Sequence, residues 1–178
     1  AEEISNWVDI KNVIDWHIIL LFSNNGDGIM KNFYLYKLNR ATPFRFAIWD
    51  YDHSFGRDGD NERNLMEREL NCKNAILFER LNNVLEIKYL NLLQKRWFEL
   101  RKLDVISLNN FKAHITENDK IINREIKANA IKWPIDSKWY YDGNNYRKEI
   151  ELMYDFVKLR LKQLDDYFNS LKTGVVLK

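Results

Sequence analysis

The stretch that decides the fold is 25-NGDGIMKNFYLYKLNRATPFRFAIWDYDHSFG-56, in which two aromatic-rich runs lie between two polar loops. Aromatic and β-branched residues favour strands, and residues of this kind are frequent in 33–38 and 44–49. The segment 39–43 between the two runs contains Asn and Pro, which are typical of turns. The stretch therefore predicts a β-hairpin with a polar loop before it and another after it.

Segments with helical periodicity lie on both sides of the hairpin. Upstream, apolar residues recur three and four positions apart from Asp9 to Phe22, and Asp9 is well placed to be the N-cap. Downstream, the same spacing occurs in four segments, 73–83, 85–102, 108–131 and 145–171. In the last of them one apolar stripe is interpreted as a core seam rather than a cofactor site, and it comprises Ile150, Met153, Tyr154, Val157, Leu161, Leu164 and Phe168.

These elements predict an α+β fold that is mostly α, in which a helical bundle follows one β-hairpin. The length of 178 residues is that of one domain, which we assign to 1–172, with 173–178 as a tail. The first residues show neither an initiator Met nor the basic and apolar regions of a signal peptide. We therefore expect the chain to begin inside a longer protein.

Composition argues against two kinds of partner. The formal net charge is +2, the signs are mixed and there is no basic run, so nucleic acid is not expected. The longest apolar stretch, Ile18 to Phe22, is far shorter than the roughly 20 residues of a membrane-spanning helix. The single Cys72 excludes an internal disulfide and leaves the compartment unknown.

The loop before the hairpin holds Asp27 and Asn32, an Asp followed five residues later by an Asn. Phosphoryl transfer to an alcohol needs a carboxylate that accepts the alcohol's proton and a ligand for the metal that neutralises phosphate charge. The catalytic loop of protein kinases has these two groups at the same Asp-x4-Asn spacing. The spacing predicts Asp27 as the catalytic base and Asn32 as a metal ligand.

The loop after the hairpin begins with Asp50, and Asp52 follows two residues later. In kinases, a carboxylate that holds Mg²⁺ against the nucleotide phosphates lies just past the hairpin that follows the catalytic Asn. Asp50 is therefore the leading metal-ligand candidate and Asp52 the second. We expect Asp27, Asn32 and Asp50 to converge closely enough to share a divalent cation and an alcohol.

Each of these residues also has a structural interpretation. Asp beside Gly is typical of a turn, and an Asn before a strand often caps it. The two loop carboxylates can instead form ion pairs with Arg45, Arg57 or Arg63. A calcium loop of the EF-hand type is excluded, because Phe55 stands where Gly is required. His17, on an apolar helix, is interpreted as a core residue rather than a metal ligand.

Taken together, the motifs Asn25-x-Asp27, Asn32-Phe33-Tyr34-Leu35-Tyr36 and Trp49-Asp50-x-Asp52-x-x-Phe55-Gly56 resemble the CotH family of atypical kinases, named for a bacterial spore coat protein. The hairpin, the Asp-rich loop and the helices after it extend the resemblance over nearly the whole chain. The resemblance implies a kinase-like C-lobe in which the hairpin carries the catalytic and metal-binding loops.

The resemblance also implies roles and partners. Asp27 takes the catalytic role, Asp50 binds the metal and the nucleotide, and Asn32 and Asp52 assist at the metal. The expected cofactor is ATP with Mg²⁺ or Mn²⁺, and the substrates are Ser or Thr side chains of secreted or coat proteins. The expected location is outside the cell or at its surface. A kinase also needs an N-terminal lobe that supplies a cation to the phosphates, so this chain alone is expected to turn over little.

Two other functions are compatible with the sequence. One is a non-catalytic binding module of the cell surface or spore coat that keeps the same fold, because a shared fold does not establish activity. The other is a small-molecule phosphotransferase of the aminoglycoside-kinase type, in which Asp58, Asp60 and Glu62 would line a cleft for cationic ligands. The role of the loop 57–71, as a substrate gate or a plain connection, stays open.

Overall fold

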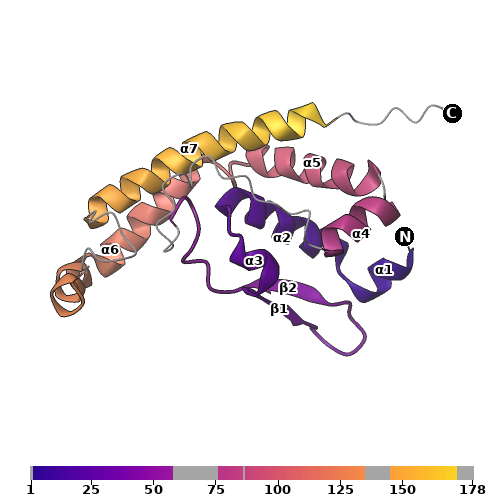
Figure 1. Ribbon diagram of the computed structural model, residues 1–178, viewed down its shortest axis with the longest axis horizontal. Coiled ribbons are helices and arrows are strands. Elements are labelled where there is room, and N and C mark those ends of the chain that lie inside the picture. The colour runs from indigo at the N-terminus through magenta and orange to yellow at the C-terminus, as the bar shows by residue number, and fades with distance from the viewer. Residues whose placement is uncertain (1, 58–75, 86, 135–144, 172–178) are drawn as a thin grey trace.

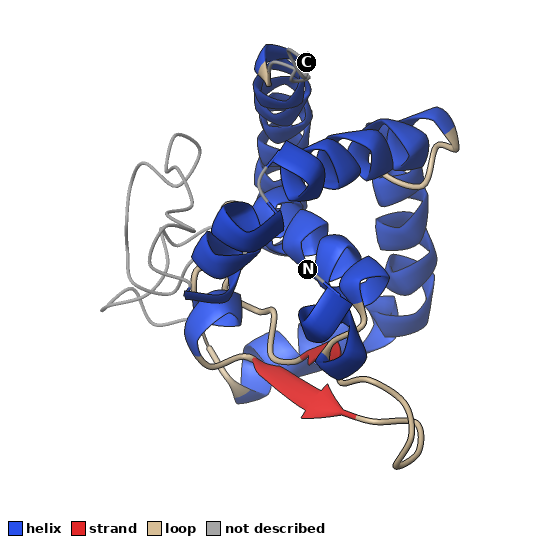
Figure 2. Ribbon diagram, turned by 90° about the vertical axis from the view of Figure 1, so that its right-hand side faces the viewer, coloured by secondary structure: helices blue, strands red, loops and turns tan. Residues whose placement is uncertain are grey.

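The computed structural model describes residues 2–57, 76–85, 87–134 and 145–171. The fold is α+β and mostly α, as predicted, with one two-stranded sheet at the edge of a helical body (Figures 1 and 2). The elements in chain order are α1 Glu2–Trp7, α2 Ile10–Ser23, α3 Asp27–Met30, β1 Phe33–Tyr36, β2 Arg45–Ile48, α4 Ile76–Leu85, α5 Ile87–Lys102, α6 Leu108–Lys132 and α7 Tyr146–Ser170.

The predicted hairpin is confirmed, although both strands are shorter than the aromatic runs that predicted them. β1 and β2 pair in antiparallel register from Phe33 opposite Ile48 to Tyr36 opposite Arg45. Phe46 of β2 is buried, and its ring stacks on Trp16 of α2 with the centroids 4.2 Å apart. This contact holds the hairpin against the middle of the helical body and places its two flanking loops beside α2.

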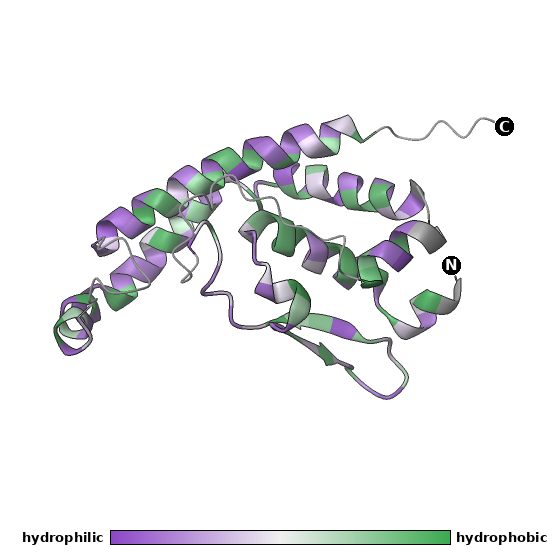
Figure 3. Ribbon diagram, viewed as in Figure 1, coloured by the Kyte–Doolittle hydropathy of each residue, from purple (hydrophilic) through white to green (hydrophobic). Residues whose placement is uncertain are grey.

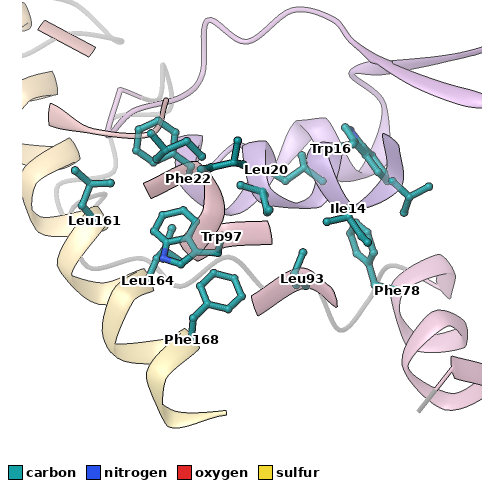
Figure 4. Close-up of a cluster of buried hydrophobic side chains, with 14 of the residues drawn as sticks. Ile14, Trp16, Leu20, Phe22, Phe78, Leu93, Trp97, Leu161, Leu164 and Phe168 are labelled. Carbon is teal, nitrogen blue, oxygen red and sulfur yellow. The ribbon is translucent and has the colours of Figure 1, made fainter. Parts of the chain in front are cut away.

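Helix α2 is the central element. Its predicted N-cap is confirmed, because the Asp9 carboxylate accepts a hydrogen bond from the Asn12 amide at 3.1 Å. Hydrophobic residues cover much of its surface (Figure 3). Side chains from α2 meet those of α4, α5 and α7 in one core (Figure 4), which includes Ile14, Trp16, Leu20, Phe22, Phe78, Leu93, Trp97, Leu161, Leu164 and Phe168.

The four downstream helices lie close to their predicted ranges, and residues 73–75 of the first range lie outside the described residues. In α7 the core-seam interpretation is confirmed for Val157, Leu161, Leu164 and Phe168, which are all buried. Helix α6 contributes no buried residue and runs beside α7 away from the rest of the molecule (Figure 1). Its weak periodicity agrees with this exposed position. Within the described residues, no helix combines the length and apolar character needed to cross a bilayer.

His17 is a core residue, as its position on an apolar helix predicted. It is 6% exposed, its ring stacks on Phe78, and its Nδ1 lies 2.9 Å from the hydroxyl of Tyr89. Burial disfavours the charged imidazolium and lowers the pKa of His17 from 6.5 to about 3. The folded protein therefore keeps this side chain neutral at pH values where the unfolded chain already binds a proton.

The buried His17 should make the free energy of unfolding depend on pH. Between pH 6.5 and 3 the unfolded state binds one more proton, so acid destabilises the fold by at most about 1.4 kcal/mol per pH unit. Above pH 7 the imidazole is neutral in both states and adds no pH dependence. Urea unfolding of wild type and His17→Phe from pH 7 to 4 measures the difference in slope, with exposed His114→Gln as the control. Parallel profiles for wild type and His17→Phe would contradict this assignment.

Candidate functional site

The first part of the candidate site is the turn 24–28, which we call the Asp27 turn. It begins with Asn24, the C-cap of α2, in the left-handed conformation with φ 55°. Asn25 is fully buried, and its side-chain oxygen accepts a hydrogen bond from the Gly28 amide at 2.8 Å. The sequence predicted a loop here, whereas the structure places Asp27 as the first residue of the one-turn helix α3. The buried amide of Asn25 stabilises that helix at its N-terminal end.

The Asp27 carboxylate is paired with a cation from its own helical turn. Its Oδ2 lies 2.9 Å from Nζ of Lys31, and 40% of the Asp27 side chain is exposed. A pair of this kind, four residues apart and open to water, contributes only about 0.3–0.5 kcal/mol to stability. Asp27 is therefore accessible from solvent, and Lys31 brings a positive charge to the same place.

Asn32 joins the Asp27 turn to the loop that follows the hairpin. Its backbone amide donates to the Asp27 carbonyl at 3.0 Å, and its side-chain Nδ2 donates to the Asp50 carbonyl at 2.8 Å. Its own carbonyl accepts from the Trp49 amide at 3.2 Å. Asn32 is buried, so these bonds are shielded from competing water. One chain of hydrogen bonds thus connects the three predicted residues Asp27, Asn32 and Asp50.

The loop 49–57, which we call the Asp50 loop, turns sharply where it leaves β2. Asp50 has φ 56°, a left-handed conformation that Asp tolerates better than most residues. Its side chain is exposed, and no ion pair or hydrogen bond links its carboxylate to another described residue. The predicted alternative of an Arg partner is wrong for two of the three candidates, since Arg45 pairs with Asp9 and Arg57 with Glu149. The third, Arg63, lies outside the described residues.

Asp52 points to solvent at the outer side of the same loop. Its side chain is 69% exposed, and Oδ2 lies 3.6 Å from Nε2 of His53. Its Oδ1 also accepts a hydrogen bond from the His53 amide at 2.9 Å. The structure does not join Asp52 to the hydrogen-bond chain through Asn32, which includes the backbone carbonyl of Asp50.

A contact between the two loops that sequence reasoning missed involves Gly28 and Tyr51. A Cβ atom at Gly28 would lie 2.6 Å from Leu20 Cδ2 and 2.8 Å from Tyr51 Oη. Burial raises the pKa of Tyr51 to about 12, so its hydroxyl stays neutral at ordinary pH. In the sequence, only the glycine that follows Asp27 points to this contact. Because Gly28 has no side chain, it leaves room for the ring of Tyr51.

Backbone strain is concentrated around this site. Four non-glycine residues in the described part of the chain have positive φ, and three of them, Asn24, Asp50 and Phe55, lie in the two loops. A bulky Phe in this conformation is unusual, and its amide donates to the Ser23 carbonyl at 2.7 Å. The surrounding packing therefore holds both loops in conformations that their sequences would not adopt alone.

The ligand atoms fit a hard divalent cation only in part. No cluster of three His, Cys, Asp or Glu side chains occurs among the residues that the structure describes. Mg²⁺, however, commonly uses one or two carboxylates together with substrate phosphates rather than a complete protein cage. The exposed carboxylate of Asp50 fits a site of that open type, whereas Asn32 is buried and bonded to the Asp50 carbonyl through Nδ2.

The fold and the site define a mostly helical protein that carries accessible carboxylates on two joined loops around a hairpin. A family model described as "CotH kinase protein" matches residues 1–164, and the chain therefore belongs to this family. "Inner spore coat protein H" of Bacillus subtilis (strain 168) is 34% identical over 61 residues. That match covers 34% of this chain and only 17% of the length of the relative. No solved structure matches significantly.

Proposed function

We propose that this chain is the catalytic and metal-binding part of a CotH-like atypical protein kinase. In the full-length protein it transfers the γ-phosphoryl group of ATP to Ser or Thr hydroxyls of protein substrates. The observation that carries the proposal is the hydrogen-bond chain from the Asp27 carbonyl through Asn32 to the Asp50 carbonyl, with distances of 3.0 and 2.8 Å. Asp27 and Asp50, which are 23 positions apart in sequence, are thereby linked through Asn32 at the end of the hairpin where β1 begins and β2 ends.

The roles follow from what each side chain offers. The Asp27 carboxylate, paired with Lys31 and partly exposed, accepts the proton of the acceptor alcohol and orients its oxygen. Asn32 donates Nδ2 to Asp50, which leaves its side-chain oxygen as a metal ligand. Asp50 supplies the charged oxygen, and Asp52 is a further ligand if its loop turns inward. ATP with Mg²⁺ or Mn²⁺ would supply the phosphoryl group and the charge that offsets phosphate repulsion.

The relative's name supports a location and a second candidate. The relative is named as a spore coat protein. We therefore propose that this chain is associated with a coat or cell surface and that its acceptor proteins lie there. A non-catalytic coat-assembly module with the same fold is the alternative. The exposure of both the Asp50 and the Asp52 carboxylates favours it, because a dedicated metal site would fix its ligands more firmly.

Exchange of Asp50 for Asn tests the proposal through its metal dependence. Asn also tolerates φ 56°, so the variant removes charge with little backbone strain. The full-length protein is incubated with ATP and increasing Mg²⁺ or Mn²⁺, and phosphate incorporation into itself and into candidate coat proteins is followed. We expect Asp50→Asn to need at least about tenfold more metal for half-maximal transfer.

The control for this assay is Asp166→Asn, which removes an exposed carboxylate from the pair with Lys162 on α7. It should match wild type at every metal concentration. Equal transfer by wild type and Asp50→Asn, or no transfer by the full-length protein with either metal, would overturn the kinase proposal and favour the coat-assembly alternative.

A further inference from the structure

Arg160 of α7 is a buried cation that reaches the Asp27 turn. The residue is 6% exposed, and its Nε donates to the Leu21 carbonyl at 2.7 Å. Two longer contacts of 3.4 Å join its terminal nitrogens to the side-chain oxygens of Asn24 and Gln163. Leu21 lies in the last turn of α2, and Asn24 is the first residue after that helix. Arg160 of α7 therefore contacts the segment that leads to Asp27.

The charge of Arg160 is matched to the end of α2. The last carbonyls of a helix lack partners within the helix and carry partial negative charge, which a cation stabilises. Helix α2 ends at Ser23 and has no basic residue in its own last turn. Arg160 supplies the missing cation from 139 positions away in sequence. Burying a guanidinium is costly unless its donors are satisfied, so the contacts are needed for the fold to keep it there.

The Asp27 turn is held only in part by its own sequence, through the bond from the Gly28 amide to the Asn25 side chain. Asn24-Asn25-Gly26 is a run of turn formers, Gly26 provides no side-chain cap for α3, and α3 has only four residues. A single helical turn is unstable in isolation. The position of Asp27 therefore depends also on contacts with other elements, and Arg160 makes one of them with Asn24, next to its bond with Leu21 near the end of α2.

We propose that Arg160 is a positioning residue for Asp27. It fixes the end of α2 and the left-handed Asn24, and these set the direction in which α3 starts and the place of the Asp27 carboxylate. Arg160 touches neither substrate nor metal in this scheme and acts through the turn alone. The predicted effect of Arg160 on phosphate transfer rests on the proposed function of Asp27. Its predicted effect on the conformation of the turn does not.

Hydrogen exchange tests the proposal without any assay of activity. The amides of Ile29, Lys31 and Asn32 are bonded to carbonyls of Gly26 and Asp27 and so report on α3. We expect Arg160→Met in the full-length protein to raise their exchange rates by about tenfold or more, and Arg160→Lys by less, since one ammonium replaces only part of the guanidinium contacts.

Two further variants keep this test falsifiable if Arg160→Met is poorly folded. Asn24→Gly keeps the left-handed backbone but removes one of the acceptors of Arg160, and should raise exchange in α3 like Arg160→Lys. Arg101→Met is the matched control, because Arg101 is another partly buried arginine, bonded to Asp165 of α7 and to the Ile106 carbonyl. It should leave the α3 amides unchanged. Unchanged exchange in the Arg160 and Asn24 variants would overturn the proposal.

The same variants separate this proposal from the kinase proposal. In an active protein, Arg160→Met should lower kcat by at least about tenfold while the KM for ATP changes little, and Arg160→Lys should recover part of the rate. Arg101→Met should keep the wild-type kcat. Faster exchange in α3 without a fall in kcat would overturn the positioning role. A wild-type protein without transfer would remove the kinase proposal, and the exchange data would still decide whether Arg160 holds the turn.

Discussion

Exchange of Asp27 for Asn is expected to lower phosphate transfer by the full-length protein by about 10²–10⁴-fold, the usual contribution of a general base. Asn has nearly the same shape but cannot take up the alcohol's proton. The side chain is 40% exposed and forms a solvent-open ion pair with Lys31, so the free energy of unfolding should change by less than about 0.5 kcal/mol. The loss should therefore appear in kcat and not in the thermal midpoint.

Single-turnover transfer to a protein acceptor, measured beside thermal unfolding, checks both halves of this expectation. The control Asp15→Asn removes a surface carboxylate that pairs with Arg96 and lies on the outer side of α2. It should keep the wild-type rate. An Asp27→Asn protein that transfers phosphate at the wild-type rate would remove Asp27 from the catalytic role.

Gly56→Ala should destabilise the fold by about 2–5 kcal/mol. Gly56 has φ 77°, a conformation that costs an L-residue about 1–2 kcal/mol. A Cβ atom there would also lie 2.7 to 3.0 Å from three atoms of Phe156, which is 1% exposed and part of the core. Overpacking of a core adds about 1–3 kcal/mol. Because Gly56 ends the Asp50 loop, the displaced loop should also bind metal more weakly.

Gly28→Ala is the matched control for this prediction, since the substitution is the same and the backbone conformation is not strained. A new Cβ atom there would also lie close to packed side chains, those of Leu20 and Tyr51, so both variants add overpacking and only Gly56→Ala adds the strain of a positive φ. Urea unfolding of both variants compares the two. A smaller loss for Gly56→Ala than for Gly28→Ala would contradict the account of strain at Gly56.

The sequence was most informative where one segment determines its own conformation. The helix after Asp9 and the hairpin were predicted because capping, periodicity and aromatic runs are local signals. The short helix α3 was not, because four residues of turn-forming sequence carry no helical period and are held by tertiary contacts. Helix α1 was also not predicted, and its six residues are too few for a clear pattern.

For the candidate site, spacing and the resemblance to a known family selected Asp27, Asn32 and Asp50, and the structure joins them through the amide of Asn32. The contacts that hold the two loops were not predictable from the sequence. Arg160 stands among the apolar residues of α7 and looks like an ordinary surface arginine, because its partners on α2 are more than 130 positions away. Such pairings are set by the packing of helices and leave no local signal.

Helix α7 contacts both loops from one face, through Phe156 beside Gly56 and Arg160 beside Asn24. These two residues are one helical turn apart, so a rise of about 6 Å along α7 separates its contact with the Asp50 loop from its contact with the Asp27 turn. An insertion of a single residue between them would rotate one contact by about 100° relative to the other and release one loop. Evolution can therefore vary the length of the helix at either end far more freely than between these two positions.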